Sequence, residues 1–352
     1  MKKIFIILFC LLLSGCYNYI ELDELAVVTM IAVDYKDDDY IITLEIRENI
    51  KDEDNKSLIY KGKGKSLDSA IQNTSFGMNK ILYFVDLEML VLSQDAISNK
   101  LDSIIDYLTR DNNVGVNFKT LFDDNIDENI LNIKEKYKIV WQNIKQMIES
   151  YFNNIVNVKY YDFLENYLSD MKDLILPYGV IQDGAYIINQ AVIFNGNKIV
   201  EKLDFNKSNI YNLLNKTEAL YLFNNEYHNH QVVFKAGDYK VKFDYKNNKI
   251  FIKLNINGNL DEIESIDLKN EKNVQNLIKI IKLNIKDDCD EFVRLIKEKD
   301  ADVLGFKKVI YNKTKKKIES IRDLNYDIDV NVTLDRKGLI FESIGDVHEK
   351  NN

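Results

Sequence analysis

Proline, cysteine and histidine are scarce in this sequence. Its 352 residues include one proline, three cysteines, three histidines and 13 glycines. A single proline excludes a proline-rich linker, and so few glycines argue against a collagen-like segment or a glycine-rich phosphate loop. Three cysteines are too few for a disulfide framework. We therefore expect ordinary hydrophobic cores, for which the length leaves room in two or three domains.

The cysteines and histidines do not form a metal-ligand pattern. Cys10, Cys16 and Cys289 include no CxxC pair, and among the histidines only His228 and His230 are close together. Two residues apart on a strand, these two side chains would point to one face. A solvated strand edge accounts for that pair without a metal. We therefore predict no metal site, and nothing in the sequence indicates a cofactor.

Negative charge exceeds positive charge. The chain carries 56 Asp and Glu residues against 47 Lys and Arg residues, a net charge of −9. No basic tract is long enough to follow a phosphate backbone, so we expect no nucleic-acid partner. With 46% hydrophobic and 29% charged residues, the composition is typical of a globular chain and not of a disordered one.

Residues 1–15 have the pattern of a secretory signal. A Lys-Lys pair precedes the apolar run 4–13, which is too short to cross about 30 Å of hydrocarbon as a helix. A small Ser-Gly pair then leads to Cys16. Leu-Ser-Gly-Cys resembles the bacterial lipobox, in which the cysteine thiol receives a diacylglycerol and the peptide is cut just before it. The resemblance makes Cys16 the lipidation site and membrane lipid a partner. The alternative is an ordinary signal peptide with an incidental cysteine.

Hydrophobic periodicity predicts the elements that follow. We expect strands at 25–33, 40–48, 87–93, 116–122, 230–236, 239–244, 249–257 and 327–338. We expect helices after an N-cap at Ser66, over 98–111, through most of 126–175 and near 208–216. Pro177 interrupts the pattern and indicates a boundary, and a hairpin turn follows at 195–197.

The clearest helix starts at Glu271. Apolar residues recur there at spacings of three and four and form one stripe: Val274, Leu277, Ile278, Ile281, Ile285, Cys289, Phe292, Val293 and Ile296. Because Cys289 lies on this stripe, we expect a buried and inert thiol.

These elements predict an α+β fold with more than one domain, in which mixed sheets pack against helices. The long amphipathic helix belongs to the C-terminal domain. The expected ranges are a lipoprotein signal peptide at 1–15, an N-terminal α/β-containing domain at 16–125, a mostly helical middle region at 126–182 and a C-terminal α+β domain at 183–348.

Short motifs run through the chain in a recognisable order. They are Glu21 and Leu22 after Cys16, Asp34 at a strand end, Gly64 and Ser66 in a Gly-Lys-Ser segment, Arg110 and Asp111 at a helix end, Pro177 in a Leu-Pro pair, Ala301, Asp302, Gly305 and Phe306 in ADVLGF, and Gly338 in Arg-Lys-Gly. This collinear set resembles the Ger(x)C family, the lipoprotein C subunits of spore germination receptors.

The resemblance implies a function without catalysis. It implies a lipoprotein subunit of a nutrient germinant receptor, required for spore germination, on the outer face of the spore inner membrane. Its partners would be the two multispanning subunits, A and B. No catalytic residue and no cofactor is implied. We expect structural roles for the motif residues: buried or capping contacts for Glu21, Asp34, Arg110 and Asp302, and turn conformations for Gly305 and Gly338.

Two other functions would suit a secreted lipoprotein. A transporter's solute-binding lipoprotein usually has repeated βα units in two lobes, whereas this chain segregates strands from helices. An extracytoplasmic enzyme would be expected to carry a catalytic motif. Gly-x-Ser-x-Gly, HExxH and a cysteine with a suitably placed histidine are missing from the sequence. An enzyme without a known motif is the less favoured of the two.

Overall fold

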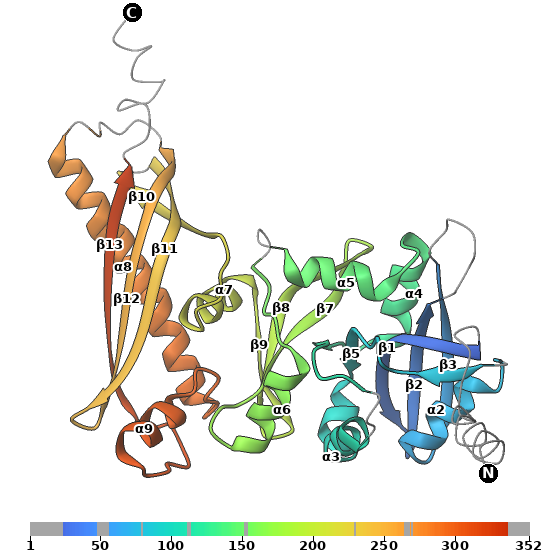
Figure 1. Cartoon of the computed structure of the whole chain (residues 1–352). Coiled ribbons are helices and arrows are strands. Elements are labelled where there is room, and N and C mark those ends of the chain that lie inside the picture. Colours follow the sequence, from blue (N-terminus) through green and yellow to red (C-terminus); the bar gives the residue numbers. More distant parts are fainter. Residues whose placement is uncertain are drawn as a thin grey trace, which may run out of the picture.

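The structure is a computed structural model of the chain. It describes residues 24–47, 56–78, 80–110, 114–150, 154–228, 230–263, 268 and 270–336. These residues form two lobes that lie side by side (Figure 1). Each lobe is built on a sheet of its own.

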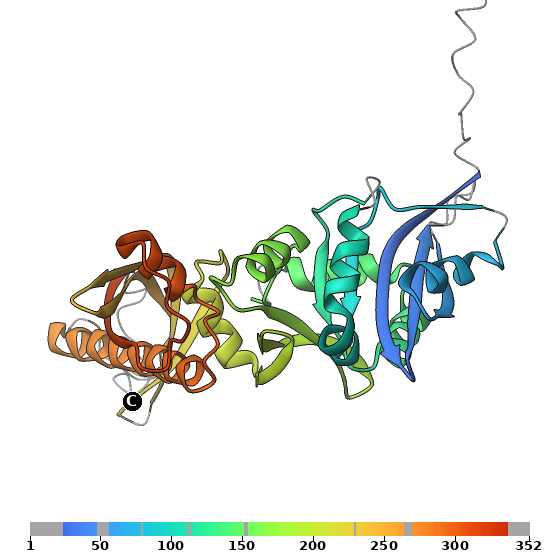
Figure 2. The same ribbon diagram turned by 90° about the horizontal axis from the view of Figure 1, so that it is seen from below.

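The N-terminal lobe contains, in chain order, β1 (Leu25–Lys36), β2 (Asp39–Arg47), β3 (Ser57–Gly64), α2 (Leu67–Ser75), β4 (Ile81–Tyr83), β5 (Met89–Leu92), α3 (Gln94–Arg110), β6 (Lys119–Phe122), α4 (Ile126–Lys136), α5 (Val140–Glu149), α6 (Tyr160–Ser169), β7 (Ile175–Gln182), β8 (Ala185–Asn195) and β9 (Lys198–Leu203). The C-terminal lobe contains β10 (Tyr221–Tyr227), β11 (His230–Lys246), β12 (Lys249–Ile263), α8 (Glu271–Glu298), α9 (Phe306–Thr314) and β13 (Asn325–Arg336). Between the lobes lies α7 (Phe205–Leu214), as Figures 1 and 2 show.

The N-terminal lobe has three layers. Its sheet runs in the order β3-β2-β1-β5-β6-β7-β8-β9, and β4 pairs with the start of β1. Side chains of α2, α3 and α6 pack on one face of the sheet, and those of α4 and α5 pack on the other. The neighbours β1, β5 and β6 are parallel and covered on both faces, which explains why they read as continuous apolar runs.

The C-terminal lobe is a sheet covered by one long helix. Strands β10, β11 and β12 are antiparallel, and β13 pairs in parallel with β12. The predicted stripe of α8 is buried against this sheet, apart from the half-buried Ile278. Cys289 is 0% exposed, and burial raises the pKa of its thiol, as expected of an inert cysteine. No helix among the described residues is long and apolar enough to cross a membrane.

Three sequence expectations need correction. Pro177 is not at a break: it lies inside β7 opposite Ala191, because a proline fits a strand where the ladder does not need its N–H. The ranges 230–236 and 239–244 form the single strand β11, which passes through an irregularity after Ala236. His228 lies in the turn before β11, with φ of 51°, and not on a strand.

The sheets group the chain differently from the ranges 16–125, 126–182 and 183–348. Strands β8 and β9 follow residue 182, yet they pair with β7 in the N-terminal sheet. All three ranges therefore contribute strands to one sheet, and the second sheet begins only with β10.

The stripe on α8 predicts where the C-terminal lobe is sensitive to truncation. Ile281 is 0% exposed and Leu283, two residues later, is 46% exposed. Ile281→Ala should lower the free energy of unfolding by about 2–5 kcal/mol because it leaves a cavity. Leu283→Ala is the matched control and should cost less than about 0.5 kcal/mol. Denaturant unfolding followed by circular dichroism measures both, and equal losses would contradict this packing.

Candidate functional site

The ADVLGF motif lies at the junction of the two lobes. It follows the end of α8 and leads into α9. Ala301 and Phe306 are 0% exposed and belong to the C-terminal core. Gly305 has φ of 75°, the left-handed conformation that a side chain makes costly. The turn predicted at Gly305 is therefore present.

Asp302 joins the motif to the other lobe. Its Oδ1 accepts the Phe306 N–H at 2.8 Å, and its Oδ2 accepts the Lys307 N–H at 2.6 Å. Its own N–H donates to Oδ2 of Asp173 at 2.6 Å, and the Asp173 N–H donates to the Asp302 carbonyl oxygen at 3.1 Å. Asp173 lies just before β7. The Asp302 carboxylate thus accepts hydrogen bonds from the first two amides of α9, which is the capping role that we expected.

Burial sets the electrostatics of this junction. Asp302 is 0% exposed, and burial raises its pKa to about 6 although two amides and Lys307 act in the opposite direction. Burial also raises the pKa of Asp173, whose Oδ2 lies 3.9 Å from Nζ of Lys307. Burial lowers the pKa of Lys172, and its Nζ donates to Oδ1 of Asn215 at 2.9 Å.

A cleft of about 470 Å³ opens beside the junction. It lies between α6 and the start of α9 and is lined by residues of both lobes. Nζ of Lys308 on α9 lies 2.9 Å from Oε1 of Glu165 on α6, so an ion pair bridges the cleft. Both partners are more than half exposed, and such a pair contributes little to stability.

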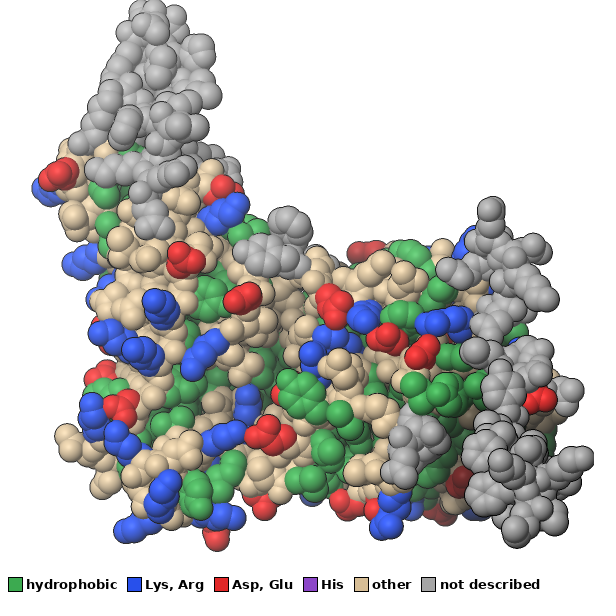
Figure 3. Space-filling view, viewed as in Figure 1, with side chains coloured by type: hydrophobic (Ala, Val, Ile, Leu, Met, Phe, Trp, Pro, Cys, Tyr) green, Lys and Arg blue, Asp and Glu red, His purple; other side chains and the backbone are tan. Residues whose placement is uncertain are grey.

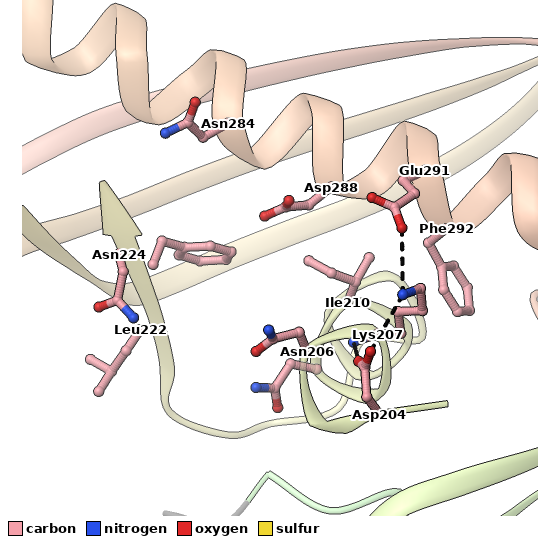
Figure 4. A pocket seen from close by; sticks show the side chains of 12 residues that line it. Asp204, Asn206, Lys207, Ile210, Leu222, Asn224, Asn284, Asp288, Glu291 and Phe292 are labelled. Atoms are coloured by element: carbon pink, nitrogen blue, oxygen red, sulfur yellow. Dashed lines mark hydrogen bonds and ion pairs between the residues drawn. The ribbon is translucent and has the colours of Figure 1, made fainter. Parts of the chain in front are cut away.

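A second pocket, of about 310 Å³, lies between α7, β10 and α8 (Figure 4). Asp288 and Glu291 project into it from α8, and burial raises the pKa of Asp288. Nζ of Lys207 lies 3.4 Å from Oδ2 of Asp204 and 3.4 Å from Oε1 of Glu291. Four asparagines, Asn206, Asn209, Asn224 and Asn284, complete the polar lining. This mixture of donors and acceptors suits a small polar molecule or water.

The other predicted motif residues are not gathered at one site. In the N-terminal lobe, Asp34 lies two residues before the end of β1. Burial acts to raise its pKa, but hydrogen bonds from Lys36, Ser93 and the Tyr35 N–H outweigh burial and lower it. Arg110 ends α3 on the surface, where its Nε lies 2.7 Å from Oδ2 of Asp106. It is therefore an exposed pair within one helix, not the buried contact or cap that we expected.

The Gly-Lys-Ser segment caps a helix. Ser66 and Ser69 form a capping box at the start of α2, with the Ser69 N–H donating to Oγ of Ser66 at 3.1 Å. A Cβ on Gly64 would lie 2.6 Å from the Ala70 nitrogen, so glycine lets the strand approach the helix. Cys16, Glu21, Leu22, Asp111 and Gly338 lie outside the described residues.

Two models of known protein families match this chain. The model described as "Spore germination protein N-terminal domain" matches residues 18–181, and the one described as "Spore germination B3/GerAC like, C-terminal" matches residues 189–338. The chain belongs to this spore germination family. The resemblance to the Ger(x)C family and the predicted role in spore germination are thereby confirmed.

A solved structure has a similar fold. The crystal structure of the GerBC protein matches with a TM-score of 0.54 and covers 87% of this chain and 97% of its own. The two sequences are 12% identical, so the similarity concerns the fold, and it confirms the predicted α+β class. No curated protein matches the chain.

Buried carboxylates that the motifs did not indicate also organise this family member. Glu45 on β2 is 0% exposed and accepts the N–H groups of Val140 and Trp141 at 2.7 and 2.8 Å, so it caps α5. Asp123, directly after β6, accepts the Tyr186 hydroxyl at 3.0 Å and the Asn129 amide at 2.8 Å. A carboxylate immediately after a buried strand was the available signal for Asp123. Within the described ranges, no three His, Cys, Asp or Glu side chains are grouped to hold a metal ion.

The junction of this spore germination protein should respond to pH through Asp302. Its pKa is about 6 in the folded chain against an ordinary 3.8, so the folded state binds this proton more tightly than the unfolded state does. The protonated Asp302 carboxyl contributes stability that is fully present below about pH 3.8. This contribution, up to about 3 kcal/mol, is lost as the pH rises through about 6. Asp302→Asn protein has no carboxyl at this position, so its free energy of unfolding should not fall in this way as the pH rises.

The measurement is the free energy of unfolding between about pH 4 and 6. The free energy of unfolding of Asp302→Asn minus that of the unchanged protein should rise with pH. Asp238→Asn, at an exposed aspartate of the same lobe, is the control and should follow the unchanged protein. Parallel curves for Asp302→Asn and the unchanged protein would show that this carboxyl is not the group involved.

Proposed function

We propose that this chain is a lipid-anchored, non-catalytic subunit of a nutrient germinant receptor, held on the outer face of the spore inner membrane. One observation carries the proposal. The two family matches cover residues 18–181 and 189–338, so the first begins two residues after Cys16, where the lipobox-like segment ends. The whole folded body thus follows the proposed lipidation site.

The anchor is proposed to be the diacylglycerol on Cys16. One acyl chain gives marginal attachment, whereas two chains hold a protein firmly. Removing residues 1–15 takes two lysines away and leaves 45 basic against 56 acidic residues, a net charge of −11. Such a body should not be attracted to anionic lipid through its overall charge, so attachment depends on apolar contacts.

The proposed mode of action is binding to the A and B subunits. The described motif residues are used for internal contacts, which supports a structural role for them. Asp302 has both carboxylate oxygens occupied by amides of α9, and Ser66 caps α2. A subunit of this kind would act by placing its two lobes against the membrane-spanning partners.

The anchor predicts a specific effect of one cysteine. Cys16→Ala should move the protein out of the membrane fraction and abolish incorporation of labelled fatty acid, because the acceptor thiol is gone. Cys10→Ala is the matched control, since that cysteine would leave with the signal peptide. Fractionation of cells that lack the A and B subunits is the decisive measurement. Retention of Cys16→Ala protein in those membranes would refute the anchor.

The receptor role predicts a loss of nutrient response. Spores in which the gene is deleted should germinate much more slowly with at least one nutrient, as measured by the fall in optical density. Restoring the unchanged gene should restore the rate, and restoring Cys16→Ala should not. An unchanged germination rate with every nutrient, in a strain without a compensating paralogue, would contradict the role.

A further inference from the structure

Apolar side chains are exposed along the segment that follows α2. Phe76 is 84% exposed, Ile81 is 53% exposed and Val85 is 46% exposed. Scattered apolar residues on a surface need no explanation, but a large aromatic left almost wholly in water, with two more exposed aliphatic residues in the next nine positions of the chain, does. Moving each such side chain out of water is worth about 1.5–3 kcal/mol. We call Phe76, Ile81 and Val85 the apolar edge.

The apolar edge lies where the chain enters the lobe. Strand β4 pairs in parallel with the first residues of β1, so that Ile81 is opposite Leu25. Residues 17–24 separate Cys16 from Leu25 and span at most about 30 Å when extended. Lipid attached at Cys16 is therefore within reach of this edge. Figure 3 shows hydrophobic side chains among charged ones on the described surface of the N-terminal lobe.

Charges of both signs lie around the edge. Lys80 is exposed immediately before β4. Glu24, directly before the Leu25 that pairs with Ile81, is also exposed. Arg47 pairs with Val27 of β1 in the sheet. Its Nη1 lies 3.4 Å from Oδ2 of Asp86, so the Asp86 carboxylate has a cationic neighbour. A lysine beside exposed apolar residues is the arrangement of segments that lie in a membrane interface, because the ammonium meets the headgroups while the apolar groups enter below them.

We propose that the apolar edge inserts into the same membrane leaflet that holds the acyl chains on Cys16. The inference rests on the proposed lipid anchor. An acyl anchor alone leaves the body free to turn on its tether, whereas a second contact at Phe76, Ile81 and Val85 fixes the orientation of the N-terminal lobe. The occupant of this surface is the bilayer, at a depth of about 5–10 Å.

The test places an environment-sensitive fluorophore on single cysteines. Phe76→Cys and Val85→Cys report on the edge, and Leu283→Cys, 46% exposed on α8, is the control for an exposed apolar site in the other lobe. Cys289 is buried and should not react. Each lipidated protein is reconstituted into vesicles of phosphatidylethanolamine and phosphatidylglycerol that contain nitroxide-labelled lipid and no receptor subunits.

We expect emission from Phe76→Cys and Val85→Cys to shift to the blue and to be quenched several-fold more than emission from Leu283→Cys. Flotation of the protein with the vesicles but equal quenching at all three positions would overturn the bilayer contact and leave the anchor standing. Protection of the edge only after addition of the A and B subunits would assign the surface to a protein partner and also overturn it. Failure of the unchanged protein to float would reject the anchor, and the inference with it.

Discussion

The reciprocal hydrogen bonds between Asp173 and Asp302 join the two lobes at a buried point. A buried carboxylate requires several donors, because desolvation otherwise makes its charge too costly. Asp302 finds them in the first turn of α9, while its own N–H reaches Asp173 of the other lobe. This contact fixes the start of α9 against the N-terminal lobe, and the Lys299–Glu201 ion pair and the hydrogen bond from the Asn195 amide to the Asp300 carbonyl oxygen add to it.

Continuity between the lobes gives the proposed receptor subunit a physical means of acting. Strands β8 and β9 extend the N-terminal sheet, and α7 then packs between that sheet and α8. A constraint placed on the N-terminal lobe, by lipid at Cys16 and by the apolar edge, would therefore also orient the C-terminal lobe. In the proposed role, in which the protein positions its surfaces against partners, that orientation is the relevant property.

Local chemistry made much of the fold predictable. The stripe on α8 follows from a 3.6-residue period, the cap at Ser66 follows from side-chain hydrogen bonding, and the central strands follow from apolar runs. Pro177 was placed wrongly because its effect depends on whether the ladder needs its N–H, which only the neighbouring strands decide. Glu45 carried no signal at all, since its partners on α5 are distant in the sequence.

Residue types and their order alone indicate the secretory pattern, the candidate lipid acceptor at Cys16, the apolar faces that make the cores, and the motif order that resembles the family. These depend on residue types and spacing along one segment. Tertiary structure decided that Asp302 meets Asp173, and that Ile81 lies beside Leu25 at the entry of the chain. Both contacts join residues far apart in the sequence, so they exist only once packing has brought their elements together.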